Sequence, residues 1–262
     1  MSPDMSDQAI KNAISTFLHG QGFHVLQIPE GKRRTPDLLA TGDHRYLIEI
    51  KTKENDPAAI SERTKRLGAG QIVESGAPFT PQNTMSRIVR DGVEQLDAHP
   101  AQERDFCMLW LLAVGSDLES QYEQFLATLY GLTNMMGPDS RSLMPCYYFR
   151  ESAFFRWRNV LDGAIVGTLD KGELCINSYS PRADAFKNSS LAGIFGTAVR
   201  DPRQREAEGR GYIADCDVDR RDEQEILRYV QTKYGRPALM TMDFGTVIAQ
   251  VAVPAGTKSD DT

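Results

Sequence analysis

The sequence predicts an α/β protein in which a mixed central sheet is flanked by helices. Residues 6–20 and 84–98 carry apolar side chains three and four positions apart, which is the spacing of one helix face. Residues 105–114 are almost continuously apolar, which indicates a strand that is buried on both faces and closes the sheet. Shorter runs with the composition of strands lie between turn residues at 23–28, 36–41 and 45–51. The order of elements is therefore helix, three strands, helix, strand.

Residues that favour helix ends support both helices. Ser6 or Asp7 can cap the first helix, and Gly20 can end it. Asn83 or Thr84 can cap the second in the same way. We expect residues 1–115 to form the core of the protein, with residues 116–262 as a C-terminal α+β extension packed on it.

Composition narrows the class of protein. The chain has 262 residues, of which 40% are apolar and 25% are charged, as in ordinary soluble proteins. No apolar run approaches the ~20 residues of a membrane span, and the polar N-terminus lacks the apolar core of a signal peptide. The four cysteines are far apart without a C-x-x-C spacing, which favours neither a zinc site nor disulfides. We expect a cytoplasmic protein with no membrane partner.

Two short strands at residues 36–51 bring together groups that could act on a phosphodiester. The two-residue period of a strand places Glu49 and Lys51 on one face, and Asp37 can reach them from the neighbouring strand. Mg²⁺ prefers oxygen ligands and needs only one or two carboxylates, which Asp37 and Glu49 would supply, with the carbonyl of Ile50 as a third ligand. Lys51 could orient or deprotonate the attacking water and offset charge in the transition state. We expect this site at a solvated rim of the sheet.

Pro36-Asp37 followed by Glu49-Ile50-Lys51 resembles the motif of the PD-(D/E)XK nuclease superfamily. The resemblance covers less than half of the chain and implies a restriction-endonuclease-like core. It also implies that Asp37 and Glu49 are metal ligands and that Lys51 is the catalytic lysine. A glutamine that several branches place on the second core helix matches Gln95.

The sequence departs from the family at the first helix. Many members place a glutamate there as a further residue of the metal site. The nearest residues in this chain are Asp7 and Gln8, and Glu30 could substitute from the loop that follows the first strand.

The resemblance implies metal-dependent hydrolysis of DNA, with Mg²⁺ as cofactor and Mn²⁺ as a possible substitute. Restriction, defence against foreign DNA and repair are the biological roles that it suggests. Two alternatives stay open: a catalytically silent nucleic-acid-binding or assembly protein of the same fold, and an RNA-directed nuclease. A homodimer would suit double-strand cleavage.

Basic residues surround the motif although the net charge of the chain is −6. The negative total argues against a general nucleic-acid coat protein, but a local basic face is sufficient for an enzyme. The candidate phosphate contacts are Lys32, Arg33, Arg34, Lys53, Arg63, Lys65 and Arg66. Apart from a short helix at 58–67, residues 53–81 show no strong periodicity, and they could either close over nucleic acid or mediate a dimer contact.

The second half of the chain has weaker patterns. We expect helices at 117–135 and 222–234, a strand at 145–149, a hairpin at 164–178, an exposed loop at 200–211 and a closing strand pair within 238–253. The aromatic residues at 147–157 are mixed with arginines, which can indicate base stacking. At this spacing they are more typical of a core.

Overall fold

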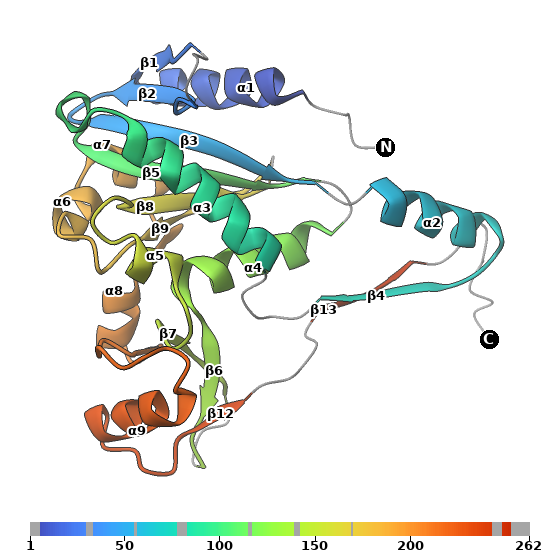
Figure 1. Ribbon diagram of the computed structural model, residues 1–262, viewed down its shortest axis with the longest axis vertical. Helices are drawn as coiled ribbons and strands as arrows, with labels where there is room; N and C mark the ends of the chain where they lie inside the picture. Colours follow the sequence, from blue (N-terminus) through green and yellow to red (C-terminus); the bar gives the residue numbers. More distant parts are fainter. Residues whose placement is uncertain are drawn as a thin grey trace.

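The computed structural model describes residues 6–29, 34–54, 57–77, 83–114, 117–138, 142–168, 170–242 and 248–252. These residues form an α/β protein with a mixed sheet flanked by helices and a smaller sheet beside it (Figure 1). Within these ranges, no helix has the length and apolar character needed to cross a bilayer.

The described residues place seven strands in one mixed sheet, in the order β1-β2-β3-β5-β8-β9-β10. The strands β3, β5 and β8 run parallel, whereas β1, β2 and β3 form an antiparallel meander. Their bounds are β1 His24–Gln27, β2 Leu38–Thr41, β3 Arg45–Lys53, β5 Phe106–Ala113, β8 Gly163–Gly167, β9 Gly172–Ile176 and β10 Val199–Arg200. The expectation that residues 105–114 close the sheet is wrong, because β8, β9 and β10 continue it beyond β5.

Helices cover both faces of this sheet, and the alternation along β3 separates the two cores. Leu47 packs in one core with α3 (Asn83–Ala98) and α4 (Leu118–Tyr130). Its neighbours Tyr46 and Ile48 pack in the other core, with α1 (Asp7–Gly20), α6 (Ala183–Lys187) and α7 (Ser190–Phe195). The predicted order of helix, three strands, helix and strand is present as α1, β1–β3, α3 and β5, with α2 (Pro57–Gly68) and β4 (Val73–Ala77) inserted before α3.

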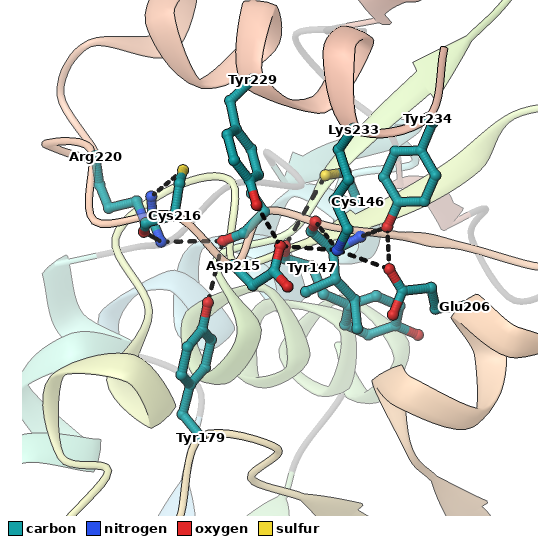
Figure 2. Close-up of polar contacts among 12 residues, drawn as sticks. Cys146, Tyr147, Tyr179, Glu206, Asp215, Cys216, Arg220, Tyr229, Lys233 and Tyr234 are labelled. Carbon is teal, nitrogen blue, oxygen red and sulfur yellow. Dashed lines mark hydrogen bonds and ion pairs between the residues drawn. The ribbon is translucent and has the colours of Figure 1, made fainter. Parts of the chain in front are cut away.

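A second sheet of the described residues has the order β11-β7-β6-β12. Its strands are β11 Tyr212–Ile213, β7 Met144–Tyr147, β6 Thr133–Met136 and β12 Met240–Met242, and α9 (Glu223–Lys233) packs against it. A polar network joins α9 to α8 (Pro202–Ala207): Lys233 contacts Glu206 at 2.8 Å and Asp215 at 2.7 Å (Figure 2). These contacts hold α8 and α9 together beside the second sheet.

Two segments that are distant in the sequence pair outside both of these sheets. β13 (Ile248–Ala252) forms an antiparallel pair with β4, and with α2 this pair lies to one side of the main sheet (Figure 1). The predicted short helix at 58–67 is confirmed as α2. The predicted strand pair within 238–253 is wrong as a pair, because β12 pairs with β6 and β13 pairs with β4.

Other expectations for the second half are partly met. The hairpin at 164–178 is confirmed as β8 and β9, and the helix at 222–234 is confirmed as α9. The helix expected over 117–135 ends at Tyr130, where Gly131 adopts a positive φ of 58° and the chain turns into β6. Residues 200–211 are not a simple exposed loop, because they contain the end of β10 and α8, and Arg200 forms an ion pair with Glu173 at 2.9 Å.

The aromatic residues at 147–157 lie largely in the core, as their spacing indicates. Tyr147, Tyr148 and Phe154 are fully buried, whereas Phe155 and Trp157 at the edge of the core are partly exposed. Phe154 and Phe155 belong to the short helix α5 (Ala153–Arg156). Elsewhere in the chain, η1 (Ala101–Glu103) is a 3₁₀ turn that precedes β5.

Candidate active site

A cavity of about 540 Å³ lies beside β3, between residues of α1 and α3. Those helices cover opposite faces of the sheet, and the cavity lies at the C-terminal half of β3, beyond its pairing with β2, where both helices can contribute side chains. The residues that line it come from α1, from the segment before β2, from β3 and from α3: Asp7, Ile10, Lys11, Arg34, Thr35, Asp37, Glu49, Ile50, Lys51, Thr52, Ile88, Asp91 and Gln95.

Glu49 and Lys51 lie on the α3 face of β3, two residues apart. Lys51 Nζ is 2.5 Å from Glu49 Oε1. A glycine of α3 makes this pair possible: a Cβ built on Gly92 would lie 2.7 Å from Leu109 Cδ2 and 3.5 Å from Glu49 Cγ. The missing side chain therefore allows α3 to approach β3 closely at the site.

Asp37 joins the segment before β2 to both β3 and α1. Its Oδ2 accepts a hydrogen bond from the backbone N–H of Ile50 at 2.8 Å. Its Oδ1 forms an ion pair with Nζ of Lys11 at 2.7 Å, and the Asp37 side chain is only 11% exposed. These contacts hold the carboxylate in the cavity beside Glu49.

Gln95 of α3 orients Lys51. Its Oε1 accepts a hydrogen bond from Lys51 Nζ at 2.7 Å, and its Nε2 donates to the carbonyl of Thr35 at 3.2 Å. The lysine ammonium is therefore held between a carboxylate of β3 and an amide of α3.

Glu49 has an unusual electrostatic environment for a carboxylate. The residue is 1% exposed, and its Oε2 has no hydrogen-bond partner within the described part of the chain. Burial and the charge of Asp37 raise the pKa of Glu49 to about 7, although Lys51 opposes them. The expectation of a solvated rim is therefore wrong for Glu49, because α3 covers it.

The carboxylates of the cavity form a small donor set for a divalent cation. No group of three or more His, Cys, Asp or Glu side chains that could hold a metal ion occurs among the described residues. Asp37 and Glu49 form a set of two carboxylates, and one buried oxygen of Glu49 lacks a partner among the described residues. Mg²⁺ often binds through one or two protein carboxylates and takes its other ligands from water and phosphate, so these residues fit it.

The structure brings together Asp37, Glu49, Ile50, Lys51 and Gln95, as the sequence predicts for the site. Among the candidate phosphate contacts, Arg34 lines the cavity, whereas Lys32 and Arg33 lie outside the described residues, as does Glu30. Lys53 lies at the end of β3, and its Nζ donates to the carbonyl of Glu54 at 2.7 Å. Arg63, Lys65 and Arg66 lie on α2 and do not line the cavity.

Sequence reasoning missed Lys11, which forms an ion pair with Asp37. Asp7 lines the cavity on the same helix, whereas Gln8 donates to side chains of Asn12 and Gln27 instead. Asp7 and Lys11 are four positions apart, so they lie on one face of α1. That spacing from Asp7, which the sequence already offers as a candidate, is the signal from which Lys11 could have been found.

Comparison of the chain with known protein families, with curated proteins and with solved structures finds no match. The assignment of a function therefore depends on the residues of the cavity themselves.

Proposed function

We propose that this protein is a Mg²⁺-dependent nuclease with a restriction-endonuclease-like core, and that it hydrolyses phosphodiester bonds in DNA. The observation that supports this most strongly is the convergence of Asp37, Glu49 and Lys51 in one cavity, with Gln95 bound to the lysine. Asp37, Glu49 and Lys51 belong to one local hairpin, whereas Gln95 comes from α3. The contact of Gln95 with Lys51 is therefore a property of the fold, and a chance match of sequence letters would not require it.

Each side chain has a role that its contacts allow. Asp37 and Glu49 would hold the metal, with the Ile50 carbonyl as a further ligand, and a bound Mg²⁺ would polarise the phosphate and the attacking water. Lys51, held by Gln95 and Glu49, would orient that water and offset the negative charge of the transition state. Lys11 and Arg34 add positive charge to the walls of the cavity, where a phosphate must enter.

Cleavage of supercoiled plasmid in the presence of Mg²⁺ or Mn²⁺ tests this function. We expect nicked or linear products with the wild-type protein. Glu49→Gln and Lys51→Met should each reduce the rate at least about a hundredfold, because one removes a metal ligand and the other removes the ammonium. Asp97→Asn, an exposed carboxylate change on the same helix as Gln95, is the matched control and should cleave normally.

Wild-type rates in both site variants would refute the assignment of the site. Parallel digestion of RNA of similar length distinguishes an RNA-directed enzyme. Failure of the wild type to cut either polymer would favour the silent nucleic-acid-binding protein, and a cytoplasmic role in restriction, defence or repair would then have no catalytic basis.

A further inference from the structure

A second cavity, of about 350 Å³, lies on the other flank of α3, against α5. The residues that matter for its chemistry are Asn83, Arg87, Arg90, Thr128, Arg156 and Trp157. It shares none of its lining with the candidate active site, although both cavities use α3 as a wall.

Three arginines make this cavity basic. Arg87 and Arg156 are exposed, and neither has an ion-pair partner among the described residues. Arg90 is neutralised by two carboxylates, because its guanidinium contacts Asp91 at 3.2 Å and Glu94 at 3.8 Å. Glu151 is the carboxylate that lines the cavity, so positive charge predominates there.

A buried hydroxyl in the wall of this cavity lacks a partner. Thr128 of α4 is 3% exposed, and its Oγ1 makes no hydrogen bond to any described residue. Buried hydroxyls in proteins are nearly always bonded, so this one indicates a ligand or water that completes it. An anion held by the arginines would offer acceptor oxygens to this donor.

Trp157 adds an aromatic surface beside the arginines. The Arg156 guanidinium lies 5.8 Å from the centre of the Trp157 ring, which is within the range of a cation–π contact. This contact leaves the charge of Arg156 available. A guanidinium suits a phosphate, which it can bind through two N–H groups.

Helix α3 contributes side chains to both cavities. Ile88, Asp91 and Gln95 line the candidate active site, whereas Arg87 and Arg90 line the second cavity. A helix with its side chains is about 10–12 Å wide, and one strand of B-form DNA advances about 3.4 Å per nucleotide. A strand that crosses the outer surface of α3 would therefore place phosphates in both cavities roughly three to four nucleotides apart.

We propose that the second cavity binds a backbone phosphate of the DNA substrate, a few nucleotides from the bond that is cleaved. The inference deepens the proposed nuclease function and takes its ligand class from it. The evidence for an anion site is independent of catalysis, because it consists of Arg87, Arg156 and the Thr128 hydroxyl, which have no ion-pair or hydrogen-bond partner among the described side chains.

The test is the binding of a fluorescein-labelled DNA duplex by fluorescence anisotropy, in EDTA, over a range of salt concentrations. A duplex of about 20 base pairs is long enough to cover both cavities. The double substitution Arg87→Gln/Arg156→Gln should weaken binding at least about tenfold at low salt. It should also make the slope of log K against log salt less steep by about 1, because the contact to one phosphate is lost.

Two further variants separate the proposed site from general charge effects. Arg228→Gln changes an exposed arginine of α9 and should leave both affinity and salt slope at wild-type values. Thr128→Val removes the hydroxyl at similar volume, and it should weaken binding about two- to fivefold without changing the slope, because the lost donor is neutral.

The outcomes distinguish this inference from the nuclease proposal. Wild-type affinity and slope in the double variant would overturn the phosphate site and leave any observed cleavage intact. Weakened binding in the double variant, with no cleavage by the wild type, would support the phosphate site and contradict the proposed nuclease activity. No binding of the duplex by the wild type would overturn both.

Discussion

Glu49 is a buried carboxylate with one oxygen bound to Lys51, and the other has no partner in the part of the chain that the structure describes. Its pKa is raised from 4.5 to about 7 by burial and by Asp37. Between these two values the folded protein retains a proton that the unfolded chain releases. The free energy of unfolding therefore falls as the pH rises through this window. A bound cation would oppose this fall in the free energy of unfolding, because it favours the ionised carboxylate.

Glu49→Gln should consequently stabilise the metal-free protein in alkaline buffer. The neutral amide avoids the cost of a buried charge, so the free energy of unfolding should rise by about 1–3 kcal/mol one pH unit above the raised pKa. The gain should shrink as the pH falls through about 7 and vanish near 4.5. Urea denaturation in EDTA across this range measures it. A pH-independent difference between the two proteins would show that Glu49 has no raised pKa.

At the residue scale, the sequence predicts which side chains share a face but not how deeply they are buried. The period of β3 is sufficient to place Leu47, Glu49 and Lys51 together. The burial of Glu49 depends on how closely α3 approaches, which is set by Gly92 and by the contact of Gln95 with Lys51. These are long-range contacts, and no local pattern in the sequence reveals them.

At the scale of elements, the close packing of α3 on β3 makes a testable claim about Gly92. Gly92→Ala would gain about 1 kcal/mol of helix propensity, but the new methyl would meet the buried side chain of Leu109. Overpacking of a core costs about 1–3 kcal/mol, so we expect a net loss of stability of about 1 kcal/mol. The movement of α3 should also separate Gln95 from Lys51 and reduce cleavage at least about tenfold.

Gly193→Ala is the matched control for this prediction. Gly193 lies in helix α7, and a Cβ there would meet no atom within 4 Å. The control should be neutral or slightly stabilising and should not alter cleavage. Thermal denaturation and the plasmid assay on both variants decide the matter. Equal stability and equal cleavage rates in the two variants would show that a methyl group fits between α3 and β3 at the site.

The network around Lys233 allows a second prediction at this scale. Burial opposes the charge of Lys233, but its hydrogen bonds to Asp215 and Glu206 outweigh this effect and raise its pKa. Lys233→Met should lower the free energy of unfolding by about 1–3 kcal/mol, because it leaves two carboxylates without their shared cation. Lys65→Met on exposed α2 should change it by less than about 0.5 kcal/mol. Equal effects in urea denaturation would contradict a stabilising role for the network.

The elements that were predicted correctly are those with local signals. The Ser6 side chain accepts a hydrogen bond from the N–H of Ala9 at the start of α1, and Asp222 accepts from Glu225 at the start of α9. The helix that the sequence predicts at 117–135 includes most of β6, because Thr133–Met136 continues the apolar character of that helix after Gly131. The β4–β13 pair was also missed, since its strands are separated by most of the chain.

At the scale of the whole molecule, the main sheet uses both halves of the sequence. The parallel pairing of β5 with β8 joins residues 108–112 to residues 163–167, and β5 is buried along its whole length. An apolar run of this kind predicts a central strand, but it does not identify its partners. The position of the candidate site was predictable because Asp37 and Glu49 lie in one local hairpin, whereas Lys11 and the second cavity depend on the assembled fold.

The central claim is that Asp37 and Glu49 share a divalent cation beside Lys51, and calorimetric titration of Mn²⁺ into the purified protein tests it most directly. We expect one site per chain, with an affinity that increases as the pH rises through about 7, because the cation competes with the proton on Glu49. Asp37→Asn and Glu49→Gln should each weaken binding at least about tenfold, whereas Asp97→Asn should bind as the wild type does. The absence of binding, or equal binding by all four proteins, would contradict the claim.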